Sequence, residues 1–253
     1  MTTLAGRTIL ITGASSGIGA NLARAAAKAG AKVAAAARRA DKLADLVALI
    51  AADGGTAQAF AMDVEDEASV IAGYDAVEAA FGAPEWVIAN AGISLQGSAL
   101  DISIDDFDKV QAVNTRGAFL TAREGARRMI KAGSPESQRG RILLVASIGA
   151  HHVLPGLTAY VTSKAATAHM GKSLAREWAR KGINVNVLCP GYIKTEINAE
   201  WFDSEGGSRL MTGFPRRRLL ETADLEALAL YLCSDEARAV TGSEFTVDDG
   251  QFL

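Results

Sequence analysis

The fold of this chain is decided by a glycine-rich stretch near its beginning, Thr12-Gly13-Ala14-Ser15-Ser16-Gly17-Ile18-Gly19. An apolar run at about 7–12 leads into this stretch and helical apolar spacing follows at about 17–29, so the glycines fall at a strand-to-helix turn. Glycine allows the tight turn and lets the backbone approach a pyrophosphate, which the amides at the helix N-terminus then bind. A glycine-rich string on its own can mark a turn and nothing more. In this context we predict a dinucleotide site formed by Gly13, Ser15, Ser16, Gly17, Ile18 and Gly19.

The rest of the chain alternates between short Val- and Ile-rich runs and longer segments of helical period. The short runs predict strands at about 7–12, 32–37, 57–62, 85–90, 140–146, 183–189 and 244–248. The longer segments predict helices at about 17–29, 41–53, 66–81, 105–131, 158–181 and 222–233. Such alternation predicts a single-domain α/β fold over residues 1–253, with a doubly wound parallel sheet and helices on both faces. Residues at about 191–220 lack a clear period and are expected to form a substrate lid.

The overall composition restricts the class of protein. Of 253 residues, 49% are hydrophobic, which suits one large core, and the formal net charge is −3 with no long basic block. Nucleic acid and anionic membranes are therefore poor partners, and the run at 216–218 is expected to be a solvated or intersubunit patch. Cys189 and Cys233 lie in apolar runs and predict buried free thiols in a reducing compartment. We expect a cytoplasmic protein without a cleaved leader or a membrane span.

The end of the second predicted strand bears on the choice of dinucleotide. It reads Ala36-Ala37-Arg38-Arg39, without the acidic residue that would bind the ribose hydroxyls of NAD. A guanidinium suits a 2′-phosphate, so we predict NADP(H) in preference to NAD(H), with Arg38 as the primary contact and Arg39 as a weaker second. The alternative is a solvated arginine pair that opens the next helix. Asp63 and Val64, after the third strand, either contact an adenine or, through Asp63, cap the helix that begins near residue 66.

Tyr160 and Lys164 are four residues apart and share one face of a predicted helix. A phenol with the reference pKa of about 10 is a poor base at neutral pH, and a neighbouring cation favours its ionised form. Ser147 follows the fifth strand, at the sheet edge where ligands bind in open α/β folds, although a serine there can also serve only the turn. Asn114 is a mediocre helix former inside a long helical segment, where it is either functional or a kink residue.

Taken together, these residues resemble the short-chain dehydrogenase/reductase family over essentially the whole chain. Thr12 to Gly19 matches its TGxxxGxG motif, and Tyr160 to Lys164 matches its YxxxK motif. The remaining matches are the NAG motif at Asn90, Ala91 and Gly92, the catalytic serine at Ser147, and the PG segment at Pro190 and Gly191 with the downstream Thr195. The resemblance implies a Rossmann-type fold with seven strands in the order 3-2-1-4-5-6-7.

The resemblance also implies roles for individual residues. It assigns a catalytic tetrad with no metal, in which Tyr160 exchanges the proton, Ser147 orients the carbonyl, Lys164 lowers the phenol pKa and binds the nicotinamide ribose, and Asn114 holds a water. Asn90 would stabilise the sheet beside the cofactor, while Ile193 and Thr195 would bind the carboxamide. A homotetramer formed through the helices at about 105–131 and 158–181 and the last strand is implied as well.

Two positions depart from the family pattern. Ala89 stands where many relatives have a second Asn, and this leaves the NAG motif intact. Asp249 stands where relatives often have Gly, and the sequence offers no physical reason for it.

Large apolar side chains gather in the two segments expected to frame the substrate, about 148–157 and 191–220. The lid contributes Tyr192, Ile197, Trp201, Phe202, Leu210, Met211 and Phe214, and the first segment contributes Leu154. His152 could contact the substrate as well or be a partly solvated loop residue. We predict a roomy site for a bulky apolar or aromatic ketone or secondary alcohol. The alternative is that these groups pack within the protein or against a neighbouring subunit.

Two other functions stay open at this point. The stretch from Lys172 to Glu177 and on through Gly191 resembles 3-oxoacyl-acyl-carrier-protein reductases, whose acidic carrier protein Arg127, Arg128 and Lys172 could meet. A protein that senses NADP(H) without turnover is the non-enzymatic alternative, although such a protein has no need of a complete tetrad.

Overall fold

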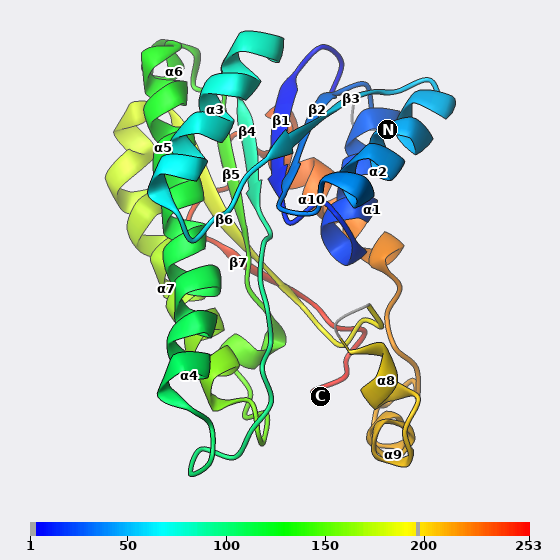
Figure 1. Cartoon of the computed structure of the whole chain (residues 1–253). Helices are drawn as coiled ribbons and strands as arrows, with labels where there is room; N and C mark the ends of the chain where they lie inside the picture. Colours follow the sequence, from blue (N-terminus) through cyan, green and yellow to red (C-terminus); the bar gives the residue numbers. More distant parts are fainter. Residues whose placement is uncertain (1–3, 196–197) are drawn as a thin grey trace.

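The centre of the molecule is a parallel β-sheet. Within residues 4–195 and 198–253, which the computed structural model describes, seven strands lie in the order β3-β2-β1-β4-β5-β6-β7 (Figure 1). They are β1 (Thr8–Thr12), β2 (Lys32–Ala37), β3 (Thr56–Ala61), β4 (Trp86–Ala89), β5 (Gly140–Val145), β6 (Ile183–Pro190) and β7 (Glu244–Val247). Every neighbouring pair is parallel. The predicted doubly wound sheet and its strand order are confirmed.

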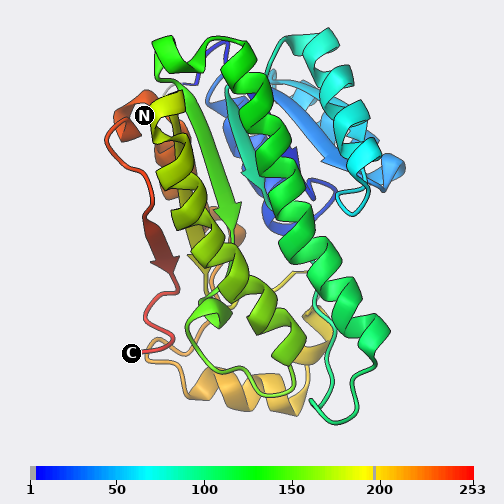
Figure 2. The same ribbon diagram turned by 90° about the vertical axis from the view of Figure 1, so that its left-hand side faces the viewer.

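Helices pack on both faces of the sheet (Figures 1 and 2). One face carries α1 (Gly17–Lys28), α2 (Ala40–Ala52) and α10 (Glu226–Cys233), and the other carries α3 (Glu67–Phe81), α5 (Gly117–Lys131) and α7 (Thr158–Trp178). Successive strand residues serve different cores: Ile9 and Ile11 pack with the first set, and Leu10 packs with the second. This alternation explains why the strands are apolar at consecutive positions.

The helix expected at about 105–131 is interrupted. The structure has α4 (Ile104–Gln111), a π-helical turn at Ala112–Arg116, and then α5. A π turn holds an extra residue and often occurs at a functional position. This turn contains Asn114, so the expectation of one continuous helix is wrong at the point where a site residue lies.

The lid segment is more regular than its sequence indicates. It contains α8 (Ala199–Phe202) and α9 (Glu205–Thr212), while Glu196 and the predicted substrate residue Ile197 lie outside the described residues. Two glycines near the start of α9 lower its helix propensity, and the Ser204 hydroxyl accepts a 3.3 Å hydrogen bond from the Gly207 amide as a cap. A further short helix, α6 (Ser134–Ser137), precedes β5.

The start of α3 decides between the two interpretations of Asp63. Asp66 is the N-cap, and its carboxylate accepts a 2.9 Å hydrogen bond from the amide of Ala68. Asp63 instead accepts a 3.1 Å hydrogen bond from the amide of Glu65 within the preceding turn. The interpretation of Asp63 as the helix cap is therefore wrong.

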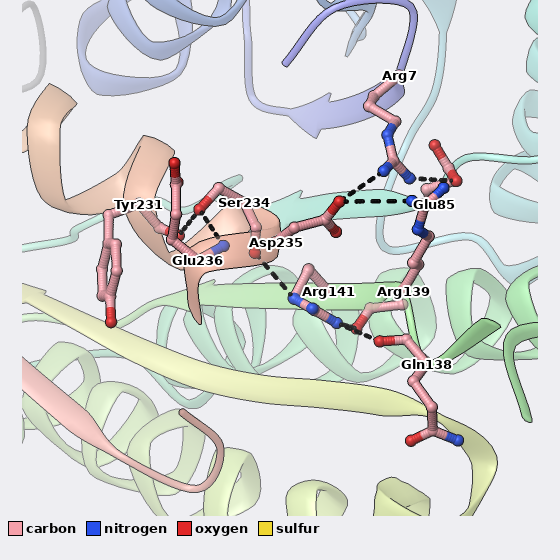
Figure 3. A network of polar contacts seen from close by, with 10 residues as sticks. Arg7, Glu85, Gln138, Arg139, Arg141, Tyr231, Ser234, Asp235 and Glu236 are labelled. Atoms are coloured by element: carbon pink, nitrogen blue, oxygen red, sulfur yellow. Dashed lines mark hydrogen bonds and ion pairs between the residues drawn. The ribbon is translucent and has the colours of Figure 1, made fainter. Parts of the chain in front are cut away.

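A polar network ties β5 to the segment after α10 at the amino ends of the strands (Figure 3). The buried Arg141 guanidinium donates to the carbonyl oxygens of Ser234 at 3.2 Å and Gln138 at 3.0 Å. Burial lowers the pKa of Arg141. Asp235 accepts a 2.8 Å bond from Arg7. These contacts stabilise the end of the sheet opposite the carboxyl ends of the strands.

None of the helices in the described part of the chain is both long and apolar enough to cross a membrane.

Candidate active site

The glycine-rich turn between β1 and α1 lies directly against the loop that follows β4. Gly13 has a φ of +67°, and a Cβ there would lie 2.7 Å from the Cα of Ala91. A Cβ on Gly19 would lie 2.4 Å from the Gly13 oxygen. The Asn90 side chain donates to the carbonyl oxygens of Thr12 at 3.0 Å and Gly13 at 3.3 Å. The two predicted cofactor motifs are thus held together by contacts that no larger residue would allow.

The first turn of α1 has no side-chain cap. Ser16 occupies the N-cap position without making a side-chain cap hydrogen bond, and Gly17 begins the helix with a φ of +54°. The methyl group of Thr195, from the lid segment, lies 3.5 Å from the position of a Gly17 Cβ. Backbone amides, a helix N-terminus and a hydroxyl-bearing side chain therefore meet at one place, a donor set suited to a phosphate.

The two arginines after β2 point to different partners. Arg38 lies 3.4 Å from the carboxylate of Glu65 and 3.8 Å from that of Asp63. Arg39 donates to the hydroxyl of Ser15 at 2.9 Å and to that of Ser16 at 2.6 Å. Of the pair, Arg39 is the one that contacts the glycine-rich turn, whereas the sequence pattern assigned the larger role to Arg38.

Val64, beside Asp63, is buried and lies close to the beginning of α5. A Cβ on Gly117 would lie 2.7 Å from a Val64 methyl group. The predicted adenine-side segment is therefore packed against the π-helical turn and α5.

The predicted catalytic residues come together at the carboxyl end of β5. Ser147 follows this strand, and its hydroxyl accepts a 3.0 Å hydrogen bond from the Gly149 amide. The same hydroxyl is hydrogen-bonded to the phenol of Tyr160, on the first turn of α7. The ammonium of Lys164 lies 5.7 Å from the centroid of the Tyr160 ring. The phenol, hydroxyl and ammonium thus converge as the sequence predicts.

The electrostatics of this group are dominated by burial. Burial raises the pKa of Tyr160, and the hydrogen bond with Ser147 opposes this only in part. Burial also lowers the pKa of Lys164, to about 8. The Lys164 ammonium donates to the main-chain carbonyl of Val145, and its effect on the phenol pKa stays a prediction. The phenol is therefore held in its protonated form at neutral pH.

Asn114 is held in the π-helical turn by three hydrogen bonds. Its side-chain oxygen accepts from the Ile93 amide at 2.8 Å, and its side-chain nitrogen donates to the Ile93 oxygen and the Ser163 hydroxyl, both at 2.9 Å. A Cβ on Gly92 would lie 3.3 Å from the Asn114 oxygen and 3.4 Å from the Lys164 nitrogen. The NAG loop, the π turn and α7 thus meet around Gly92.

The PG segment, at the end of β6, leads into the lid segment. Ile193 is buried and forms an isolated parallel bridge with Leu220, at the other end of the lid segment. The Thr195 amide donates to the Asn198 side chain at 2.8 Å. Asn198 in turn donates to the Ile193 oxygen at 2.9 Å. The two predicted carboxamide contacts are thus fixed by an asparagine that no sequence motif identified.

Aromatic side chains form a row beside the catalytic group. Tyr192 stacks on Phe214 at 5.6 Å between centroids and meets Phe202 edge-on at 5.7 Å. Trp201 contacts Phe202 at 4.9 Å and is 38% exposed. Leu154 is buried next to the segment after Ser147, where a Cβ on Gly149 would lie 3.1 Å from a Leu154 methyl group.

The chain end adds residues to this row that sequence reasoning missed. Phe252 stacks on His152 at 4.2 Å and on Tyr192 at 6.0 Å. Neither periodicity nor a motif marks Phe252, because its position follows from contacts between distant segments.

Comparisons with known proteins agree with this geometry. The family described as enoyl-(acyl carrier protein) reductase matches residues 13–251. The chain is 36% identical over 247 residues to a D-threitol dehydrogenase of Mycolicibacterium smegmatis, covering 98% of this chain and 93% of the relative. A short-chain type dehydrogenase/reductase from Mycobacterium marinum superposes with a TM-score of 0.94 at 36% identity, covering 99% and 97% of the two chains. A gluconate 5-dehydrogenase from Burkholderia cenocepacia J2315, solved with NADP and tartrate, superposes with a TM-score of 0.92 at 33% identity, covering 98% and 96%.

Proposed function

The chain belongs to the short-chain dehydrogenase/reductase family, and on this basis we propose that it is an NADP(H)-dependent oxidoreductase interconverting a ketone and a secondary alcohol. The observation that carries the proposal is the convergence of Ser147, Tyr160 and Lys164 at the carboxyl end of β5. The glycine-rich turn lies at the same edge of the sheet, as the ligand site of an open α/β fold requires.

The residues present fit a nicotinamide dinucleotide. Glycines stand where a Cβ would collide with the neighbouring loop, and the N-terminus of α1 has no side-chain cap. Gly13, Ser15, Ser16, Gly17, Ile18 and Gly19 would hold the pyrophosphate, Asp63 and Val64 the adenine side, and Gly92, Lys164, Ile193 and Thr195 the nicotinamide side. When bound, the cofactor supplies or accepts a hydride.

The chain itself supplies the proton. Because burial keeps the Tyr160 phenol protonated, this phenol donates the proton to the carbonyl oxygen during reduction. In oxidation the phenol first loses its proton to solvent, and the resulting phenolate accepts the proton of the alcohol. Ser147, which is already hydrogen-bonded to the phenol, orients the carbonyl oxygen. Asn114 and Lys164 both lie near Gly92, and we assign to them the return of the proton to the phenol, as the family resemblance implies.

Our preference for NADP(H) rests on Arg39. Its guanidinium lies over the hydroxyls of Ser15 and Ser16, so that a 2′-phosphate here would meet a cation and two hydroxyls. Arg38 is a second contact, and it lies beside Glu65 and Asp63. The NADP in the gluconate 5-dehydrogenase neighbour supports this choice.

The aromatic row favours a substrate with a bulky apolar or aromatic group next to the carbonyl. Phe202, Phe214 and Phe252 offer ring faces and edges, and the hydroxyl of Tyr192 is the one hydrogen-bonding group that these four side chains carry. The alternative of a carrier-bound 3-oxoacyl thioester is disfavoured because its three candidate cations are engaged within the chain. Lys172 is paired with Glu244 at 2.8 Å, and Arg127 and Arg128 are both paired with Glu124.

A second copy of the chain is the partner we propose, in a homotetramer by analogy with the family. An apolar hollow on α4, the π turn, α5 and α7 supports an intersubunit contact, and it is lined by Gln111, Ala112, Thr115, Arg116, Phe119 and Met170. Light scattering of the purified protein tests the assembly.

The buried free thiols of Cys189 and Cys233 support a cytoplasmic location.

The Tyr160→Phe variant tests the proposed function. NADPH binding, followed by fluorescence titration, should persist, whereas ketone reduction should fall by a factor of about 10² or more because the proton donor is lost. A panel of an aryl methyl ketone, a four-carbon polyol and a carrier-bound 3-oxoacyl thioester separates the substrate classes. Undiminished reduction by the variant contradicts the mechanism, whereas NADPH binding by the wild-type protein without reduction of any member of the panel assigns the protein to the class of NADP(H) sensors.

A further inference from the structure

The carboxyl-terminal tail, residues 248–253, follows β7 and lies against the beginning of the lid segment (Figure 1). The Gly191 amide donates a 2.8 Å hydrogen bond to the oxygen of Val247. A Cβ on Gly191 would lie 2.4 Å from the side-chain oxygen of Gln251 and 2.7 Å from the Cα of Asp248. The glycine of the PG segment is therefore required by the tail that packs on it.

Gln251 joins the two ends of the lid segment. Its side chain is buried, with 7% of the residue exposed, and its oxygen accepts a 2.7 Å hydrogen bond from the Tyr192 amide. Its nitrogen donates to the main-chain oxygens of Tyr192 at 3.3 Å and Arg218 at 3.4 Å. One amide group thus contacts the lid where it leaves β6 and where it returns to the body of the protein.

Asp249 holds the same returning end of the lid by charge. Its carboxylate accepts a 2.7 Å hydrogen bond from Arg218 and lies 3.3 Å from Arg216. The Arg218 hydrogen bond is the main cause that lowers the pKa of Asp249. The backbone of Asp249 adopts a φ of +53°, a conformation that asparagine, aspartate and glycine tolerate best. These contacts give the physical reason for an acid at a position where relatives often have glycine.

Phe252, in the tail, contacts two residues that are predicted to line the substrate site. It stacks on His152, which lies in the segment after Ser147, and on Tyr192 at the start of the lid. Burial raises the pKa of Tyr192, and the charge of ionised Tyr160 adds to this shift. Phe252 thus contacts one residue from each of the two segments predicted to frame the substrate.

We propose that the tail belongs to the substrate site. Gln251 and Asp249 are positioning residues that hold the two ends of the lid, and Phe252 is a specificity-determining residue. With His152 and Tyr192 it forms the wall against which the flat apolar part of the substrate packs. The specificity role rests on the proposed ketone reductase function, whereas the positioning role does not.

Hydrogen exchange of the free protein tests the positioning role without substrate or cofactor. Gln251→Ala removes the acceptor of the Tyr192 amide, so exchange at this amide and over α8 and α9 should speed up by a factor of about ten or more. Asp249→Asn should speed exchange at the returning end of the lid. Leu253→Ala is the matched control, because this neighbouring side chain is fully exposed. Equal exchange in Gln251→Ala and the control overturns the positioning role.

Steady-state kinetics with two ketones test the specificity role. Phe252→Ala should lower kcat/KM for an aryl methyl ketone by a factor of about ten, mainly through KM, because a stacking ring is lost. For a short alkyl methyl ketone the loss should stay below a factor of about three. Phe252→Tyr keeps the ring and should restore the aryl ketone activity, with NADPH affinity unchanged throughout.

The outcomes are distinguishable. An equal loss on both ketones, or no loss on either, overturns the specificity role of Phe252. If the wild-type protein reduces neither ketone, the proposed function fails, and the exchange measurements still decide whether the tail positions the lid.

Discussion

The ammonium of Lys164 is buried at the end of β5, where it donates a 2.9 Å hydrogen bond to the main-chain carbonyl of Val145. A main-chain dipole compensates only part of the hydration that this cation loses on folding. Burial accordingly lowers the pKa of Lys164 from 10.5 to about 8. The charged Lys164 side chain at the site therefore lowers the free energy of unfolding of the protein.

This cost predicts a pH dependence of folding. Between pH 8 and 10.5 the unfolded chain binds the Lys164 proton more tightly than the folded chain does, so the free energy of unfolding should rise with pH in this window. Relative to Lys164→Met, the wild-type protein should gain about 2–3 kcal/mol from pH 7 to 10.5. Urea unfolding of both proteins at several pH values measures the gain. Lys172→Met, at an exposed lysine, should leave the slope as it is, and parallel curves for wild type and Lys164→Met contradict the prediction.

The two arginines after β2 should contribute unequally to cofactor choice. Arg39→Ala removes a cation that lies over the phosphate-binding turn, so NADPH affinity should fall by a factor of about 10–100 while NADH affinity changes little. Arg38→Ala should have the smaller effect, because Arg38 lies beside Glu65 and Asp63 rather than on the phosphate-binding turn. Fluorescence titration of each variant with both dinucleotides gives the ratio. A larger effect at Arg38 assigns the 2′-phosphate contact to that residue instead.

Asn114 should matter for both folding and catalysis. Asn114→Ala leaves the Ile93 amide and carbonyl without their partner, which should cost about 1–3 kcal/mol of stability and reduce kcat. Ser163→Ala removes only one of the three hydrogen bonds and should cost less in both respects. Urea unfolding and steady-state kinetics on the two variants separate these effects. Equal losses would mean that the contacts with Ile93 are not what holds the π turn.

Local patterns predict much of this fold and part of the site. The strands are found within a residue or so of their predicted positions, because each is a short apolar run bounded by turn residues. The residues around Ser147 and Tyr160 converge because the carboxyl ends of parallel strands meet at one edge of the sheet.

Contacts between distant segments account for what the sequence could not predict. The π turn depends on hydrogen bonds from Asn114 to Ile93 and Ser163, 21 and 49 residues away in the chain. The orientation of Arg39 toward Ser15, and the contact of Gln251 with Tyr192, likewise join residues that no local period relates. The sequence does not predict helix α9 because its two glycines lower the helix propensity of the segment. The cap and the packing of α9 stabilise the helix in the folded protein.

Gly13 and Gly54 offer a matched comparison of strain and close contact. Both have positive φ, +67° and +79°, so an alanine at either should cost about 1–2 kcal/mol in backbone strain. At Gly54 nothing lies within 4 Å of an added Cβ, whereas at Gly13 the Cα of Ala91 lies 2.7 Å from it. Gly13→Ala should therefore cost about 1–3 kcal/mol more than Gly54→Ala and displace the NAG loop from the glycine-rich turn. NADPH affinity should fall in Gly13→Ala alone, and equal stability with unchanged affinity in the two variants would show that the close approach of the two loops does not form the dinucleotide site.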